Sequence, residues 1–291
     1  MPATIYVPSS RPDTPSNAPG HILAQPSSTA TNAFKSDSAL RTVDALVRQR
    51  AISYPEDHIV SYPRSVFEYS IEAHGDTQLD SQLDAEIETQ NIAFIIHSSG
   101  STGHPKPIYQ SHKSCLANYS VSMNMKSFIT LPLFHNHGIC NFFRALHSRK
   151  SIHLYNAELP LTQDYLLKIM QANNFEIFYG VPYALKLLSE TQKGISVLQE
   201  LKVVMYGGSA CPDDLGNLLV ENGVNLIGHY GATEVGQLMT SFRAEGDKEW
   251  NYVRESEKLS KFLQWVPRGP NLHPLLLREL PVHWGHMSSQ N

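Results

Sequence analysis

The sequence has few cysteines, no long apolar run and no block of like charge, and each absence excludes a class of protein. The three cysteines, Cys115, Cys140 and Cys211, are far apart and form no Cys-x-x-Cys pair, which favours packed, reduced thiols over a disulfide framework or a zinc site. No stretch is long and apolar enough to cross a bilayer, and the N-terminus lacks the basic and apolar segments of a secretory signal. We therefore expect a cytoplasmic protein with no membrane partner.

Charge is also scarce, because only 17% of the 291 residues are charged and the net charge is −4. A chain with this balance has no general attraction for nucleic acid, so no nucleic-acid partner is expected. What the sequence does have is 41% hydrophobic residues, enough to bury a substantial core. The composition therefore predicts a globular protein.

The pattern along the chain divides it into four parts. Residues 1–38 are rich in Pro, Ser, Thr, Asn and Ala, so we expect a disordered leader there. Residues 39–90 are weakly patterned apart from a short amphipathic helix over 40–47 and a strand over 59–62. From residue 91 to about 280, short apolar runs alternate with helical periods, which predicts an α/β core of layered parallel sheets with flanking helices. Residues 281–291 form a polar tail.

The core elements can be placed by their periods and end signals. Strands are expected at residues 92–97, 128–131, 152–154, 176–179, 202–206 and 224–227. Helices are expected after Ser111, over 137–146, from an N-cap at Thr162, after Pro182 and over 212–223. Acidic residues after Pro212 suit a helix start, and Gly223 suits a helix end.

The most informative segment is the run Ser-Ser-Gly-Ser-Thr-Gly-His-Pro-Lys at residues 98–106, directly after the first expected strand of the core. Its glycines let the backbone approach an anion closely, its hydroxyl and N–H groups can donate to phosphate oxygens, and its lysine adds positive charge. The spacing is not that of a Walker A loop. We expect this segment to hold a nucleoside triphosphate through Ser98, Ser99, Gly100, Ser101, Thr102, Gly103 and Lys106.

Three further segments follow expected strands. Ligands of open α/β sheets gather beyond the carboxyl ends of the strands, so we expect these segments to converge on one crevice. The first contains Gly207, Gly208 and Ser209. The two glycines have no side chain, so a flat adenine ring could lie against the backbone there. A tight strand-to-helix turn explains the paired glycines equally well.

The second segment contains Tyr230, Gly231, Thr233 and Glu234. Its ring could stack on a base, its glycine gives the backbone flexibility, its hydroxyl could bind a phosphate and its carboxylate could hold Mg²⁺. Taken singly, Glu234 is more typical of a solvated acid at a helix start, and Tyr230 of a packing residue.

The third segment, residues 132–138, contains Phe134, His135 and His137. A metal site is disfavoured because no Cys or third His supports the two histidines, so a polar lining for an organic substrate is favoured. A helix-capping turn remains an alternative.

Together these segments stand in the order and rough spacing of the adenylate-forming superfamily, which the sequence resembles. That superfamily contains acyl-CoA synthetases, luciferases and the adenylation domains of nonribosomal peptide synthetases (NRPS), and its members activate carboxylates as acyl-AMP with release of pyrophosphate. The sequence is most similar to fungal NRPS-like adenylation domains of carboxylic acid reductase-like enzymes. This likeness rests on Ile-Ile-His-Ser-Ser-Gly-Ser-Thr-Gly at 95–103, Asn-His-Gly-Ile at 136–139, Leu-Pro-Leu-Thr at 159–162, Glu-Val-Gly-Gln-Leu-Met at 234–239, Trp-Asn-Tyr-Val at 250–253 and Pro-Arg-Gly-Pro at 267–270.

The resemblance implies ATP and Mg²⁺ as cofactors, an aryl or aliphatic carboxylic acid as substrate, a carrier or reductase chain as partner, and a role in secondary metabolism. Residues 98–103 and Lys106 would hold the β and γ phosphates, and Gly207, Gly208 and Ser209 would flank adenine and the acyl pocket. Tyr230 would stack on adenine beside Gly231. Thr233 would contact the α-phosphate and Glu234 would bind Mg²⁺. His135 would form a gate, with Phe134 and Val181 beside it in the substrate pocket.

The resemblance covers residues 91–280, with a weaker match at 40–62. Between Arg64 and Glu88 there is too little chain for the family's usual N-terminal elements, so 39–90 is expected to be a shortened N-terminal portion of the adenylation domain. The sequence has no Thr-Gly-Asp motif after Gly285, no small C-terminal domain with a catalytic lysine and no carrier motif. A truncated enzyme is therefore expected, and the alternative is a noncatalytic nucleotide-binding or inert remnant.

Overall fold

The computed structural model describes residues 41–54, 57, 59–61, 85–98, 104–255, 257–260, 262–265 and 275–277. The predicted leader, the polar tail and five residues of the phosphate loop, Ser99, Gly100, Ser101, Thr102 and Gly103, lie outside these described residues. The division into a leader, an N-terminal portion, a core and a tail therefore stays a prediction.

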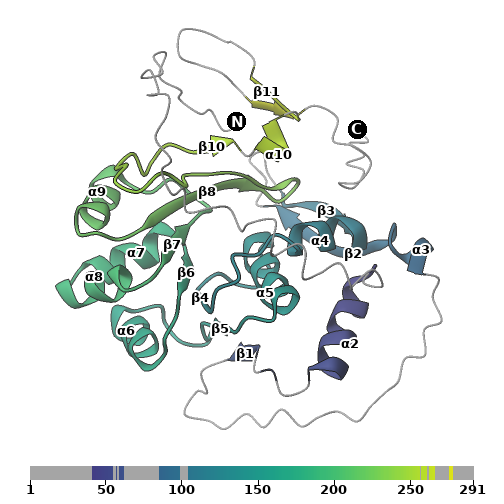
Figure 1. Cartoon of the computed structure of the whole chain (residues 1–291), viewed down its shortest axis with the longest axis horizontal. Helices are drawn as coiled ribbons and strands as arrows, with labels where there is room; N and C mark the ends of the chain where they lie inside the picture. Colours follow the sequence, from purple (N-terminus) through teal and green to yellow (C-terminus); the bar gives the residue numbers. More distant parts are fainter. Residues whose placement is uncertain are drawn as a thin grey trace.

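The described core is built on an eight-stranded sheet with the order β1-β5-β4-β6-β7-β8-β9-β10 (Figure 1). Neighbours from β1 to β8 pair in parallel, whereas β8 pairs antiparallel with β9, and β9 with β10. The strands are β1 Val60–Ser61, β4 Ser127–Ile129, β5 Ile152–Leu154, β6 Ile177–Gly180, β7 Val203–Tyr206, β8 Leu226–Ala232, β9 Gly236–Thr240 and β10 Arg254–Glu255. The expected parallel sheet is confirmed.

Helices cover both faces of this sheet, as parallel strands require. On one face Phe178, Val204 and Leu226 pack against the helices of the green layer in Figure 1. On the other face Ile177 and Met205 share a cluster with residues of α5. Successive strand residues thus point to opposite apolar layers. The first layer consists of α6 Gln163–Ala172, α7 Pro182–Ser189, α8 Gln192–Gln199 and α9 Asp213–Glu221, and the second face carries α5 Asn136–Ser148.

Local end signals explain several helix boundaries. The Thr162 hydroxyl accepts from the backbone N–H of Tyr165 at the start of α6, as predicted. Pro182 opens α7, and Gly223, with φ +81°, follows α9 in the left-handed conformation that favours glycine. In α9, a Cβ at Gly216 would lie 2.0 Å from Cζ2 of Trp250, and the Trp250 indole N–H donates to Asn217 Oδ1 at 2.9 Å. The Trp250 ring therefore lies directly on α9.

A second, two-stranded sheet corrects one expectation. β2 Ile92–Ser98 pairs antiparallel with β3 Lys106–Ser111 and is not part of the parallel sheet. The apolar run at 92–96 is typical of a buried parallel strand, yet much of β2 is exposed, as expected of a two-stranded ribbon. The phosphate loop thus connects the two strands of a hairpin, and Ser98 lies opposite Lys106 where the strands meet the loop.

Smaller elements surround this hairpin. α2 Val43–Ser53, α3 Ala85–Glu88 and α4 His112–Tyr119 lie on its side of the molecule, and α4 begins at the N-cap Ser111 as expected (Figure 1). α10 Glu257–Ser260 and a ribbon of β11 Leu263–Trp265 with β12 Leu275–Leu277 complete the described elements. Cys115, Cys140 and Cys211 are free and buried, which confirms them as packing residues. None of the described helices has the length and apolar character needed to cross a membrane.

Most expected core elements are present, with shifted ends. The strand expected at 224–227 instead continues to Ala232, because beyond Gly228 it pairs with β9. Tyr230 and Gly231 therefore lie within a strand and not in a loop after it. The helix expected at 40–47 occupies 43–53, and that expected at 137–146 occupies 136–148.

Candidate active site

The carboxyl ends of β4, β6, β7 and β8 gather the candidate segments along one edge of the sheet. Because the register is parallel, Ile129 lies beside Tyr179, and Gly180 beside Tyr206. The backbone continues this contact past the strands, since Gly207 N–H donates to Gly180 O at 3.3 Å. The segments that follow these strands, which carry the 132–138 turn, Val181 and Gly207, therefore start from neighbouring points, and their convergence on one crevice stays a prediction.

Positions 207 and 208 favour glycine for different reasons. A Cβ at Gly207 would lie 3.0 Å from His229 Nδ1 and 3.3 Å from His137 Cε1, so two imidazole rings pack against its backbone. Gly208 has φ +84°, which supports the reading of these glycines as a tight turn, and the nearest atom to a Cβ there is Val181 Cγ1 at 3.8 Å. Gly208 and Ser209 are exposed.

The 132–138 segment ends in the first turn of α5; residues 133–135 are exposed, whereas residues 136–138 are half-buried or buried. His135 is the N-cap residue of α5 but makes no side-chain capping bond, which agrees with the alternative of a helix-capping turn whose histidines do not cap. His135 is exposed, and its ring lies 4.6 Å, centroid to centroid, from the ring of Phe134 at a tilt of 51°; Phe134 is 74% exposed. A Cβ at Gly138 would lie 2.1 Å from Pro132 O, so only glycine permits the close return of this turn onto α5.

His137 and His229 form a half-buried pair of rings in contact with Gly207. Their ring centroids are 4.4 Å apart with an interplanar angle of 61°, and Tyr179 lies edge-on to His137 at 6.2 Å. His137 Nε2 and both nitrogens of His229 are inaccessible to solvent, and no described residue hydrogen-bonds to them. This pair is a feature that motif reasoning missed, because the two histidines are 92 residues apart and meet only in the fold.

Burial sets the charge of this pair. Desolvation, followed by the positive charge of Arg144, lowers the pKa of His229 to about 4. Desolvation is also the largest cause that lowers the pKa of His137 well below its ordinary value, with smaller effects from His229 and Arg144. Both imidazoles are therefore neutral at physiological pH.

Gln110, near the end of β3, joins three of the segments. Its Nε2 donates to Asn136 Oδ1 at 2.9 Å and to the carbonyl oxygen of Thr233 at 3.4 Å. Its Oε1 accepts from the Cys115 thiol at 3.7 Å. One amide thus connects the hairpin that carries Lys106, the first residue of α5 and the β8–β9 turn. Gln110 belongs to no motif, and nothing in the sequence marks it.

Thr233 and Glu234 lie in the tight turn between β8 and β9. Val235 N–H donates to Ala232 O at 3.2 Å across this turn, and both Thr233 and Glu234 are half-buried. The alternative that placed Glu234 at a helix start is wrong, because a strand follows it. A Cβ at Gly231 would lie 2.2 Å from Gly236 O, so the close approach of the two strands requires this glycine.

The remaining predicted residues lie at the margins of this arrangement. Tyr230 is half-buried and packs beside the cluster of Leu238, Met239 and Leu263, which supports its reading as a packing residue. Ser98 is half-buried and Lys106 exposed at the base of the hairpin. Within the described residues, no three His, Cys, Asp or Glu side chains gather as a metal-binding group.

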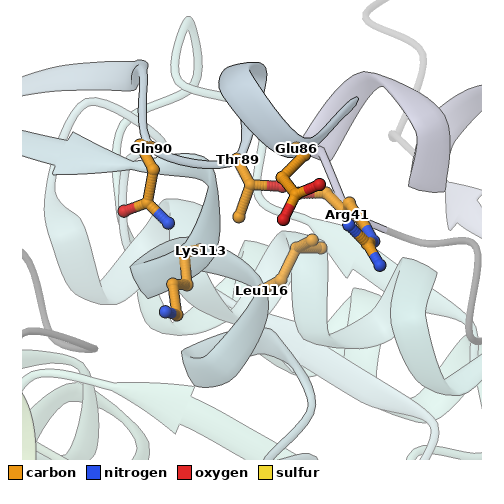
Figure 2. A pocket seen from close by; sticks show the side chains of 6 residues that line it. All are labelled: Arg41, Glu86, Thr89, Gln90, Lys113 and Leu116. Atoms are coloured by element: carbon orange, nitrogen blue, oxygen red, sulfur yellow. The ribbon is translucent and has the colours of Figure 1, made fainter. Parts of the chain in front are cut away.

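A separate hollow of about 330 Å³ lies on the α3–α4 side of the molecule (Figure 2). Figure 2 shows Gln90 and Lys113 on one side of it and Glu86 and Arg41 on the other. Thr89, between them, donates from its hydroxyl to the Arg41 carbonyl oxygen at 3.1 Å. None of the predicted site residues lines this hollow, so it is distinct from the strand-end site.

Comparison with known proteins identifies the family. The model of the family described as "AMP-binding enzyme" matches residues 11–256. An adenylate-forming reductase of Aspergillus terreus is 32% identical over 188 residues, covering 62% of this chain and 18% of that protein. The adenylate-forming reductase Nps11 of Serpula lacrymans is 28% identical over 213 residues, covering 66% of this chain and 19% of that protein.

The chain thus spans about a fifth of the length of these two relatives. Among solved structures, a malonyl-CoA ligase in a product complex with methylmalonyl-CoA and AMP has a TM-score of 0.49 at 18% identity, over 63% of this chain and 45% of that chain. Because the family match at 11–256 takes in most of the sequence and every candidate segment at the strand ends, the chain belongs to the AMP-binding enzyme family.

Proposed function

We propose that this chain activates a carboxylic acid as an acyl-adenylate at the expense of ATP, with release of pyrophosphate. The observation that carries the proposal is the contact of Gln110 with both Asn136 and Thr233. This contact brings the phosphate-loop hairpin, the start of α5 and the Thr233–Glu234 turn to one place. The same edge of the sheet carries Gly207.

The residues present fit ATP and Mg²⁺. Lys106 and Ser98 stand at the base of the loop, where a cation and a hydroxyl suit phosphate oxygens. Glu234 is a single half-buried carboxylate, and Mg²⁺ is commonly held by one or two carboxylates together with substrate phosphates. The bound ion would offset negative charge on the phosphates.

The other predicted residues receive roles in the same proposal. Tyr230 would stack on adenine beside Gly231, and Gly207, Gly208 and Ser209 would lie between adenine and the acyl group. Phe134, His135 and Val181 would face the carboxylic acid. Residues 99–103 would donate to the β and γ phosphates.

The chemistry needs no nucleophile from the protein, because the substrate carboxylate itself attacks the α-phosphorus. The residues named here would orient the two reactants and hold the charge that develops on the phosphate oxygens, chiefly through Thr233 and Lys106. Orientation of this kind supplies a large part of the barrier reduction in bimolecular steps.

The names of the relatives suggest what receives the activated acyl group. Two of them are reductases whose length far exceeds this chain. We therefore propose that the acyl group passes to a carrier or reductase partner in secondary metabolism.

The test is isotope exchange between pyrophosphate and ATP over a panel of aryl, aliphatic and keto acids. We expect exchange with at least one acid, and a reduction of about 10²-fold or more in Glu234→Gln. Glu245→Gln, at an exposed acid that follows β9, is the matched control and should retain exchange. Absence of exchange with every acid contradicts the proposal, and calorimetric binding of ATP without exchange would instead indicate a noncatalytic nucleotide-binding protein.

A further inference from the structure

We propose that the imidazole pair of His137 and His229 recognises a hydroxyl group on the acyl portion of the substrate, so that the site selects hydroxylated carboxylic acids. This inference rests on the proposed function and deepens it by naming a substrate class. It starts from polar atoms that the fold buries without a partner.

Three imidazole nitrogens carry the argument. His137 Nε2, His229 Nδ1 and His229 Nε2 are all closed to solvent, and no described residue hydrogen-bonds to them. Buried polar atoms in native proteins are nearly always paired, and unpaired ones are costly, so such a concentration at one point calls for an explanation. A ligand that pairs with them on binding supplies it.

The position of the pair fits the acyl side of the site. Gly207 is in contact with both rings, and Gly207 belongs to the segment that the proposed function places against the acyl group. Tyr179, edge-on to His137, has a pKa raised to about 12 by burial, so its hydroxyl stays protonated. The pair thus brings together uncharged rings from the first turn of α5, from β6 and from β8, with Arg144 as the nearby charge.

The charge state of the pair selects the chemistry of its partner. A neutral imidazole offers one donor and one acceptor nitrogen. A hydroxyl can accept from the donor and donate to the acceptor, whereas a carboxylate only accepts and an alkyl group does neither. An ammonium group could donate, but the positive charge of Arg144, which lowers the pKa of both histidines, disfavours a second cation there. A hydroxyl is therefore the group that satisfies this pair.

Binding of matched acids to the full chain tests the inference directly. Calorimetry would compare benzoic acid with its three monohydroxy isomers, and butanoic acid with its 2-, 3- and 4-hydroxy derivatives, each with and without ATP. We expect at least one hydroxylated acid to bind about 10-fold more tightly than its unsubstituted parent. Equal or weaker binding of every hydroxylated acid would overturn the inference.

Substitutions then assign the preference to the pair. In His137→Phe and His229→Phe the preference should fall by about 10-fold, because the ring remains but its nitrogens do not. His229→Gln keeps a donor and an acceptor and should retain part of it. His153→Phe is the matched control, because His153 is a buried histidine of β5 that packs on Phe128 and Phe175. This variant should prefer the hydroxylated acid as strongly as the wild type does.

A spectroscopic measurement on the wild type keeps the inference testable if a variant does not fold. With ¹⁵N-labelled histidine, the preferred hydroxylated acid should shift the imidazole nitrogen resonances of His137 and His229 much more than its parent acid does. Unchanged resonances on saturation with that acid would overturn the inference. Failure of the proposed function has a different signature, because pyrophosphate exchange is then lost with all acids while hydroxyl-dependent binding and the resonance shifts remain.

Discussion

The central strands of the main sheet are buried, whereas the strands of the β2–β3 hairpin are largely exposed, although both contribute to the candidate site. Every residue of β6 and β7 is buried between two layers of helices. Among the described hairpin residues only Ile96 is buried, and Ile92, Ile95 and Tyr109 are each more than half exposed. The strand ends that carry the proposed acyl side of the site are therefore fixed by a packed core.

The hairpin, which carries the proposed phosphate side of the site, depends on fewer and more polar contacts. Gln110 is the hydrogen-bonded connection from β3 to Asn136 and Thr233, and each bond of this kind contributes only about 1 kcal/mol. Regions with few buried apolar contacts open at lower free energy than the global unfolding of the protein. The comparison teaches that the packed strands and the hairpin, which carry the two halves of the candidate site, differ in local stability.

The largest expected effect lies in the packed core. Phe178 is fully buried and its ring centroid is 5.5 Å from that of Phe128. We expect Phe178→Ala to reduce the free energy of unfolding by about 3–5 kcal/mol, because it leaves a cavity that the helices cannot close. Urea titration followed by circular dichroism measures this. A loss below about 1 kcal/mol would break the comparison by showing that the core is loosely packed.

The second effect concerns pH at the boundary of the two regions. Unfolded histidine has a pKa near 6.5, whereas burial lowers the pKa of His229 to about 4 in the folded chain. Between these values the unfolded state binds the extra proton, so stability is greatest above about pH 6.5 and falls as pH decreases toward 4. Between about pH 7 and about pH 5 we expect His229 to account for a loss of about 2 kcal/mol.

Urea unfolding of the wild type and of His229→Phe at both pH values measures this contribution. The variant should show a smaller difference between the two pH values, with the remainder coming from other groups such as His137, whose pKa is also lowered. The same pH dependence in both proteins would argue against a lowered pKa of His229 in the folded chain.

A smaller effect is expected where the hairpin joins the site. Gln110→Leu removes the bonds to Asn136 and Thr233, and we expect a loss of about 1 kcal/mol in stability and of about 10-fold in ATP affinity. Calorimetry with ATP and Mg²⁺ checks the affinity. Tyr109→Leu, at the neighbouring exposed position of β3, is the matched control and should bind ATP as the wild type does. Unchanged affinity in Gln110→Leu would mean that the hairpin is positioned by other contacts.

The smallest effect is expected on the exposed side of the hairpin. Ile95 is 53% exposed, so Ile95→Thr keeps a β-branched side chain and removes little buried area. We expect the free energy of unfolding to change by no more than about 0.5 kcal/mol. A loss comparable to that of Phe178→Ala would show that further packing covers this face.

Local signals made much of the fold predictable. The N-cap Thr162, the Pro182 start and the Gly223 stop each act within a few residues, and the structure places a helix end at each. α8 was missed because only residues 190 and 191 separate it from α7, so the apolar periods of the two helices merge. The position of β2 was missed because an apolar run does not specify which strand will pair with it.

The candidate site was predictable in its parts and less so in its connections. Glycines and polar residues at strand ends could be identified from composition and order. The Gln110–Thr233 bond joins residues 123 positions apart, and the His137–His229 contact likewise depends on the packing of a helix start against a strand. Such contacts have no local signal, since they follow from tertiary packing alone.

The Trp250 ring on Gly216 has a consequence for how such a sequence can change over time. Any side chain at position 216 would occupy the space of the indole, which also donates to Asn217. A larger residue there becomes acceptable only after the tryptophan has been replaced by something smaller. We therefore expect the two positions to co-vary among homologous chains, with a small residue at one accompanying a large ring at the other.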